Sequence, residues 1–124
     1  MAAWTNDELQ KFGSEPELHV AALCDDGVTC CEPLPIWAVV VDGMLYARSY
    51  LGRKGRWYQA AMRRKAGRIG VAGLTKDVHF EPAAGVLDDR IDEAYRGKYG
   101  ASSYLAPMIA PDARATTLRI TPRD

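Results

Sequence analysis

The stretch "LPIWAVVVDGMLYARSY", residues 34–50, contains two apolar segments joined by an Asp-Gly pair at 42–43. Residues 34–41 are almost continuously apolar, which predicts a strand buried on both faces, as in a small barrel whose outer wall is covered. Asp-Gly between two such segments is the strongest short signal for a β-hairpin. We therefore expect residues 44–50 to form a second strand that returns antiparallel to the first.

Outward from this hairpin, the pattern predicts short strands and few helices. Further strands are expected at residues 18–24, 68–74, 77–82 and 116–120. Helices are expected at residues 6–12, 56–66 and 88–99. Six short strands in a chain of 124 residues favour one α+β, mainly β domain over residues 1–124. Because most connections are hairpins, we expect a closed or half-closed antiparallel barrel with three short helices.

Local signals set the expected boundaries of these elements. Thr5 and Glu8 fit a capping box at the start of the first helix. Gly67 is expected to end the second helix, and the Asp88-Asp89 pair is expected to cap the third. The turn between the strands expected at residues 68–74 and 77–82 is expected at residues 75–77.

The chain is electrically neutral, with 16 Lys and Arg against 16 Asp and Glu. This argues against a dedicated nucleic-acid binder, which usually has a large basic excess. The charge is unevenly distributed, however, because no acidic residue occurs between Asp42 and Asp77, where 9 of the 16 basic residues lie. Such a segment suits a small anion, although a solvated surface explains residues 63–65 more simply. Nucleic-acid binding through residues 48–76 is a weaker hypothesis, and it predicts a steep loss of affinity with salt.

Nothing in the sequence predicts export or membrane insertion. Residues 1–12 are too polar for a secretory signal, and no apolar run approaches the ~20 residues of a membrane span. A metal site of Cys24, Cys31 and His19 would lack a fourth ligand. The cysteines, which are odd in number, are expected to be free thiols in a reducing cytoplasm: Cys24, Cys30 and Cys31.

Residues 46–58, "YARSYLGRKGRWY", have the composition of a phosphate site. A strand that ends near Arg48 leads into a loop where Gly52 and Gly55 allow backbone N–H groups to approach a ligand. A helix that starts at residue 56 adds an N-terminus, which attracts anions, and the basic side chains of the loop can bind phosphate. An exposed loop with solvated charges would have a similar composition.

Aromatic side chains adjoin this loop. Trp37 lies on the neighbouring strand, and Trp57 and Tyr58 open the expected helix. Apolar walls beside a cationic loop suit a flat conjugated ring that carries a phosphate tail. A place in the protein core explains Trp57 at least as well. No other group of side chains forms a catalytic site, so chemistry would require a cofactor.

The stretch from Leu34 to Gly73, with its DG turn, its Gly-containing basic loop and its Trp-Tyr pair, resembles the flavin-binding split-barrel superfamily. That group includes the pyridoxamine-phosphate oxidases and the deazaflavin-dependent nitroreductases. The whole chain, from "WTNDEL" through "IDEAYRGKY" to "ARATTLRITP", is similar to an uncharacterised bacterial family of small split-barrel proteins. The resemblance implies a six-stranded antiparallel split β-barrel, usually a homodimer, with cofactor sites at the subunit interface.

The resemblance further implies a flavin-dependent oxidoreductase that binds FMN or a deazaflavin and a small-molecule substrate. It implies phosphate ligands at Arg48, Ser49, Arg53 and Lys54, and a ring near Pro35, Ile36 and Trp37. With the residues that the local pattern adds, the candidate cofactor-binding residues are Pro35, Ile36, Trp37, Arg48, Ser49, Tyr50, Gly52, Arg53, Lys54, Trp57, Tyr58 and Arg114.

The chain departs from the nitroreductases in the loop before Trp57, which is longer in that group. Their asparagine after the aromatic pair is replaced here by Gln59 or Ala60. This departure leaves a second hypothesis open, in which the protein binds no flavin and serves as a binding or interaction module. On that hypothesis the barrel and the dimer are kept, and Arg48 and the 52–55 loop bind another small anion or a partner protein.

Residues 100–115 are expected to form a long loop, with prolines at 107 and 111. Its apolar side chains, which include Tyr104 and Met108, make a free loop unfavourable, so we expect it to pack across a dimer interface or over the barrel mouth near the ligand. Arg114 would then contact the ligand phosphate or a carboxylate of the other subunit. Alternatively, the loop covers only its own barrel.

Overall fold

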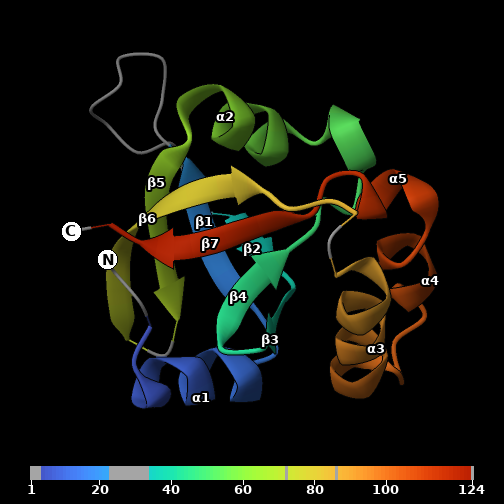
Figure 1. Cartoon of the computed structure of the whole chain (residues 1–124), viewed down its shortest axis with the longest axis horizontal. Coiled ribbons are helices and arrows are strands. Elements are labelled where there is room, and N and C mark those ends of the chain that lie inside the picture. The colour runs from blue at the N-terminus through green and yellow to red at the C-terminus, as the bar shows by residue number, and fades with distance from the viewer. Residues whose placement is uncertain (1–3, 23–33, 72, 86, 124) are drawn as a thin grey trace.

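The computed structural model describes residues 4–22, 34–71, 73–85 and 87–123. Its strands are β1 (Leu18–Ala22), β2 (Leu34–Ile36), β3 (Ala38–Val41), β4 (Met44–Ala47), β5 (Ala66–Val71), β6 (Leu74–Pro82) and β7 (Leu118–Pro122). Its helices are α1 (Asn6–Ser14), the 3₁₀ turn η1 (Gly52–Lys54), α2 (Arg56–Arg64), α3 (Asp88–Tyr99), α4 (Leu105–Met108) and α5 (Pro111–Arg114). Figure 1 shows α2 and α1 at opposite ends of the sheet, with α3, α4 and α5 along one side.

The seven strands form one antiparallel sheet in the order β2-β1-β5-β6-β7-β4-β3. The two edge strands, β2 and β3, are consecutive in the chain, and only Trp37 separates them. The sheet therefore curls until its edges almost meet, giving an α+β, mainly β protein with a nearly closed barrel. The expectation of six strands was wrong, because residues 34–41 form two strands that pair with different neighbours. A continuous apolar run gives no signal for a bend of this kind.

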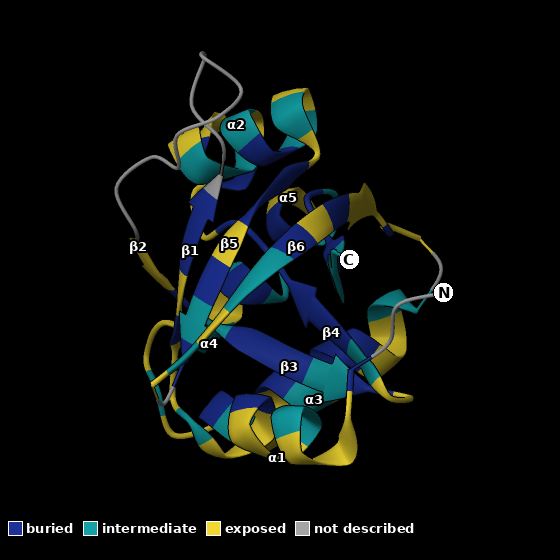
Figure 2. Cartoon of the chain, turned by 90° about the vertical axis from the view of Figure 1, so that its left-hand side faces the viewer, coloured by how far each residue is buried: buried dark blue, intermediate teal, exposed yellow. Residues whose placement is uncertain are grey.

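The β3–β4 hairpin is confirmed, and its strands are buried on both faces. Asp42 (φ 53°) and Gly43 (φ 76°) form its turn, in the left-handed region that an Asp-Gly pair tolerates. Leu45 packs into the barrel core, whereas Tyr46 packs into a second cluster under α3. Figure 2 shows most of both strands in the dark blue of buried residues. The second cluster is the expected cover on the outer wall.

The observed helix boundaries confirm some of the expected capping signals and contradict others. The capping box at α1 is confirmed, with Thr5 and Glu8 bonded reciprocally, and the bounds predicted for α3 agree with the structure. The expected cap at Gly67 was wrong, because α2 ends at Arg64 with Lys65 as its left-handed C-cap, and β5 has already begun at Gly67. A side-chain cap at the start of α3 was also wrong: Leu87 holds the N-cap position without one.

Two predicted connections differ from the structure. The β5–β6 strands pair as far as Val71 and Leu74, so the turn precedes residues 75–77; Gly73 has a φ of +80°, which glycine adopts readily. Residues 100–115 contain α4 and α5 rather than a continuous loop, so the described part of the chain has more than the three expected helices. Pro111 takes the first position of α5, where proline is well accommodated.

Two kinds of feature are absent from the described residues. No helix in that part of the chain is both long and apolar enough to cross a membrane. No cluster of three or more His, Cys, Asp or Glu side chains there could hold a metal ion. The predictions for Cys24, Cys30 and Cys31 fall outside the described residues.

Candidate functional site

A pocket of about 720 Å³ lies along β2, between the start of α2 and the start of β1. Strand β2 forms its apolar side, and the loop that follows β4 forms its polar side. Because β4 ends at Ala47, residues 48–51 belong to this loop and not to the strand. The pocket is lined by Glu17, Leu34, Pro35, Ile36, Trp37, Arg48, Ser49, Tyr50, Leu51, Lys54, Gly55, Arg56, Trp57, Tyr104 and Met108.

The pocket brings together eight of the twelve residues predicted to bind a cofactor: Pro35, Ile36, Trp37, Arg48, Ser49, Tyr50, Lys54 and Trp57. The other four are not part of its wall. Gly52 (φ +64°) turns the chain against Asp112 of α5, and the carbonyl of Arg53 accepts a hydrogen bond from Gln59. Tyr58 packs against the barrel core.

Arg114, the fourth of these residues, lies on α5 and faces the carboxylates of α3. Its Nη2 is 2.7 Å from Asp89 Oδ1 and 2.9 Å from Asp92 Oδ2. The predicted contact with a carboxylate is therefore made within the same chain. This pairing ties α5 to α3 beside the pocket.

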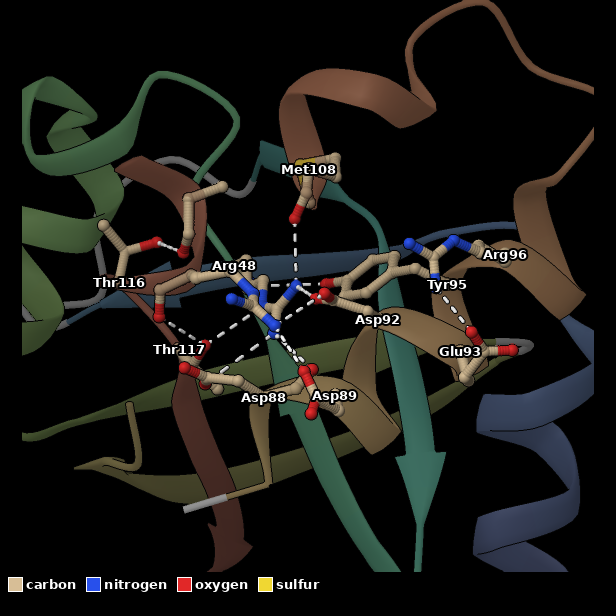
Figure 3. Close-up of polar contacts among 12 residues, drawn as sticks. Arg48, Asp88, Asp89, Asp92, Glu93, Tyr95, Arg96, Met108, Thr116 and Thr117 are labelled. Atoms are coloured by element: carbon tan, nitrogen blue, oxygen red, sulfur yellow. Dashed lines mark hydrogen bonds and ion pairs between the residues drawn. The ribbon is translucent and has the colours of Figure 1, made fainter. Parts of the chain in front are cut away.

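Arg48 lines the pocket, but its guanidinium is occupied inside the protein (Figure 3). The residue is only 1% exposed. Its Nη1 donates to Asp92 at 2.5 Å and to the Met108 carbonyl at 3.1 Å. Its Nε donates to Thr117 at 3.0 Å, and its Nη2 donates to the Asp88 carbonyl at 3.2 Å. Arg48 thus joins the β4 loop to α3, to α4 and to Thr117, which precedes β7, and its charge is neutralised by Asp92.

Tyr95 of α3 is hydrogen-bonded to the backbone of two pocket-lining residues, Arg48 and Trp37. Its hydroxyl accepts a hydrogen bond from the Arg48 backbone N–H at 3.1 Å and donates to the Trp37 carbonyl at 3.2 Å. Burial raises the pKa of Tyr95 far above its ordinary value, so the hydroxyl keeps its proton. One side chain therefore sets the separation between the β2–β3 bend and the end of β4.

Ser49 is the polar group at the α2 end of the pocket. It is 1% exposed, and its Oγ has no hydrogen-bond partner among the described residues. A Cβ placed on Gly55 would lie 2.2 Å from this oxygen, so the absence of a side chain at Gly55 is what lets α2 begin here. A buried hydroxyl without a partner is unfavourable, and a bound ligand, ion or water would complete its hydrogen bonding.

The start of α2 adds donors and positive charge beside Ser49. Gly55 is the N-cap of this helix and provides no side-chain cap, and the first N–H groups of a helix have no partner within it. Lys54 and Arg56 flank Gly55 and line the pocket. Neither forms an ion pair with any residue that the structure describes. This end of the pocket therefore has the donors and the charge of an anion site.

The opposite end of the pocket is a stacked aromatic wall. The rings of Trp37 and Tyr99 are parallel, with centroids 4.0 Å apart and an interplanar angle of 3°. The Tyr99 hydroxyl donates to the Pro16 carbonyl at 2.5 Å. Burial raises the pKa of Tyr99 to about 12. Because Tyr99 supports one face of Trp37, the indole is held in place where it lines the pocket.

The exposed large hydrophobic side chains of the described residues are concentrated at the pocket mouth. Among the described residues, the large hydrophobic side chains that are exposed are Leu34, Tyr50, Leu51 and Tyr104, and all of them line this pocket. Tyr50 and Tyr104 meet edge to face, with ring centroids 6.1 Å apart. The predicted position of Tyr104 and Met108 near the candidate ligand residues agrees with this arrangement. Apolar surface concentrated at a pocket is typical of a binding region.

Comparison with known proteins identifies the family. Residues 8–120 match the model of the family described as "Uncharacterized protein conserved in bacteria (DUF2255)". The chain belongs to this family. No match was found among curated proteins.

Two solved structures show how the fold of this DUF2255 member compares with others. A conserved hypothetical protein from Mycobacterium tuberculosis is 14% identical, with a TM-score of 0.65, over 99% of this chain and 83% of the other. An FAD-binding protein from Mesorhizobium loti is 16% identical, with a TM-score of 0.55, over 98% of this chain and 91% of the other. At these identities the similarity establishes a shared fold.

Seven wall residues were not among the twelve candidates: Glu17, Leu34, Leu51, Gly55, Arg56, Tyr104 and Met108. Arg56 directly follows the basic loop at the start of α2, so its charge was a signal that could have been followed. Glu17 precedes β1, and only the pairing of Leu18 with Ile36 brings it to the pocket. That pairing joins distant parts of the chain, and a single sequence carries no signal for it.

Lys98, next to the aromatic wall, is expected to make stability depend on pH. Its ammonium donates to the carbonyls of Phe12 and Ala38 at 2.8 and 2.7 Å. Burial lowers its pKa to about 8, partly opposed by Glu15. An unfolded chain keeps lysine protonated up to about pH 10.4. Between these values the unfolded state binds more protons, so the Lys98 contribution to stability improves as pH rises.

The test compares urea unfolding of the wild type with that of Lys98→Met from about pH 7 to about pH 10.4. We expect the wild type to gain stability relative to the variant above about pH 8. Other titrating groups are the same in both proteins and cancel in the difference. A difference that stays constant over this range would show that Lys98 is not desolvated in the folded protein.

Proposed function

We propose that this protein binds a flavin-type cofactor through its phosphate and functions as a flavin- or deazaflavin-dependent oxidoreductase. The observation that carries the proposal is the Ser49 hydroxyl, which is buried and without a partner at the uncapped start of α2. Lys54 and Arg56 supply positive charge on either side of Gly55. A phosphate placed there would accept hydrogen bonds from Ser49 and the helix N–H groups.

The rest of the pocket fits the ring of such a cofactor. Pro35, Ile36 and the supported indole of Trp37 form an apolar wall along β2. The volume of about 720 Å³ lies within the range of small-molecule and cofactor sites. When bound, a flavin supplies hydride or electron transfer; the residues of this chain bind it, orient its ring and limit access by water.

Arg48 receives a different role from the one that the resemblance implies. A phosphate could reach its guanidinium only by displacing Asp92 or the carbonyl groups that already accept its hydrogen bonds. We therefore assign phosphate binding to Ser49, the start of α2, Lys54 and Arg56. Arg48 holds the loop that presents Ser49.

The structural neighbours support this proposal only in outline. One protein with a similar fold is an FAD-binding protein, and its identity to this chain is 16%. A fold shared at this level permits many functions. The case for a flavin therefore depends on the anion end and the aromatic wall of this chain.

Fluorescence titration with FMN and with riboflavin, which lacks the phosphate, tests the proposal. We expect FMN to bind more tightly than riboflavin in the wild type. The variant Lys54→Ala/Arg56→Ala should lose most of that preference, since charge-assisted hydrogen bonds contribute about 1.5–3 kcal/mol each. Arg96→Ala, an exposed arginine of α3 that pairs with Glu93, is the control and should bind as the wild type does. Absence of binding by FMN and by a deazaflavin at about 100 µM would contradict the proposal.

A second candidate function is a cofactor-free binding module, favoured by the replacement of asparagine with Gln59 or Ala60. Such a module would use the same anion end for a ligand without a flavin ring. A purified protein that is colourless and does not bind added flavins supports this alternative. The proposed homodimer applies to both candidates, and the apolar side chains at the pocket mouth are the surface that supports it. Sedimentation of the titrated samples at about 10 µM measures the assembly directly.

A further inference from the structure

Glu17 is the acidic residue of the pocket wall. Its carboxylate forms no hydrogen bond or ion pair with the described part of the chain. Lys54 and Arg56 line the same pocket and also remain without an ion pair there. Opposite charges that shared one end of the pocket would attract strongly at short range. Their lack of pairing indicates that the acidic and basic groups lie apart.

The strand pairing shows which end of the pocket Glu17 occupies. Glu17 follows α1 and precedes Leu18, which pairs with Ile36 next to Trp37. Figures 1 and 2 both show α1 and α2 at opposite ends of the molecule, and β1 runs from one toward the other. The pocket is thus polarised along β2, with cations at the α2 end and a carboxylate at the end formed by Trp37.

This polarity restricts the ligand at the ring end. A carboxylate is an acceptor only, so it favours a ligand group that donates a hydrogen bond. A bare acyl chain or a ring edge that carries only carbonyl oxygens offers this carboxylate no hydrogen-bond donor. The Glu17 carboxylate would accept a hydrogen bond at the ring end of the ligand, while Lys54 and Arg56 bind the phosphate at the other end.

Resting on the proposed function, we infer that Glu17 accepts a hydrogen bond from an N–H group on the ring of the ligand. The ligand class is therefore an anionic heterocycle with its N–H donor at the end opposite the phosphate. Glu17 is a specificity-determining residue that sets the orientation of the ring along β2. The closeness of Glu17 to Tyr99, whose pKa it helps to raise, agrees with its position beside the aromatic wall.

The experiment measures binding of FMN and of its N3-methylated derivative, in which the ring N–H is replaced by a methyl group. We expect the wild type to prefer FMN by about tenfold or more, the effect of one hydrogen bond to a charged group. In Glu17→Ala this preference should fall to about twofold or less. Glu17→Gln retains an acceptor oxygen and is expected to keep part of the preference. Glu15→Ala, which removes a carboxylate outside the pocket wall, should leave the preference unchanged.

The comparison is read as a cycle of two ligands and two proteins, so that steric effects of the methyl group cancel. If the wild type binds FMN but Glu17→Ala shows the same preference as the wild type, the inference fails and the proposed function stands. If the wild type binds neither FMN nor its N3-methylated derivative, the inference fails, and the proposed function fails with it when a deazaflavin does not bind either. Glu17 is exposed, so its substitution leaves the core intact.

Discussion

Replacing Arg48 with methionine is expected to lower the free energy of unfolding by about 3–5 kcal/mol, the usual cost of removing one partner from a buried ion pair. Asp92 is 6% exposed and would keep a charge in the interior with Arg114 as its remaining partner. The Met108 carbonyl and the Thr117 hydroxyl would each lose a donor. A domain of this size typically has a total stability of about 5–15 kcal/mol, so the variant would be close to unfolding.

Urea unfolding measures this effect, and Arg90→Met is the matched control. Arg90 lies on α3 and pairs with Asp42, but both side chains are about half exposed. An exposed pair contributes about 0–1 kcal/mol, so the control should differ little from the wild type. Equal losses for the two variants would contradict the structural role assigned to Arg48.

The elements that the sequence predicted well are those with local causes. The capping box of α1 needs only residues 5–8, and the turn at Asp42-Gly43 needs only the left-handed conformation of two residues. The bounds of α3 follow from an apolar stripe within one segment. The bend at Trp37 has no local cause, because it arises from the pairing of β2 with β1 and of β3 with β4. A sequence read one segment at a time therefore gives six strands.

In the candidate site, too, the features with local causes were predicted and those set by long-range contacts were not. The loop after β4, the basic residues and the start of α2 are contiguous, and the structure places most of them at one pocket. The partner of Arg48 is 44 positions away on α3, and Glu17 reaches the pocket through strand pairing. Neither relation is visible in composition or spacing. An arginine next to a glycine loop therefore looked like a ligand for phosphate, although Asp92 occupies its guanidinium.

Arg48 and Ser49 are adjacent in the chain, and the hydrogen bonds of Arg48 hold the backbone that positions the Ser49 hydroxyl. The hydrogen bonds of Arg48 to α3, to α4 and to Thr117 fix the backbone at the point where Ser49 begins its turn. The Ser49 N–H is also bonded to Thr116 at 2.9 Å. The hydroxyl without a partner is thus held by a rigid support, which is the arrangement expected of a preorganised binding group.

Gly55→Ala is expected to weaken FMN binding by about tenfold or more. The backbone at Gly55 (φ −62°, ψ 129°) is ordinary for alanine, so the effect is steric. The new Cβ would lie 2.2 Å from Ser49 Oγ, and either the hydroxyl must rotate away or the start of α2 must shift. Both changes separate the hydroxyl from the helix N-terminus, and each lost hydrogen bond to a charged phosphate contributes about 1.5–3 kcal/mol.

The same clash is expected to reduce the free energy of unfolding by about 1–3 kcal/mol, as overpacking usually does. Ser49→Ala removes the hydroxyl, and the remaining contacts of the Gly55 Cβ are 3.4 Å or longer, so Gly55→Ala should cost little in that background. Gly13→Ala is the control, because nothing lies within 4 Å of its Cβ position, and it should leave FMN binding unchanged. If Gly55→Ala destabilises the protein equally with and without the Ser49 hydroxyl, the two residues do not meet as the structure shows. The anion site built on their contact would then be wrong.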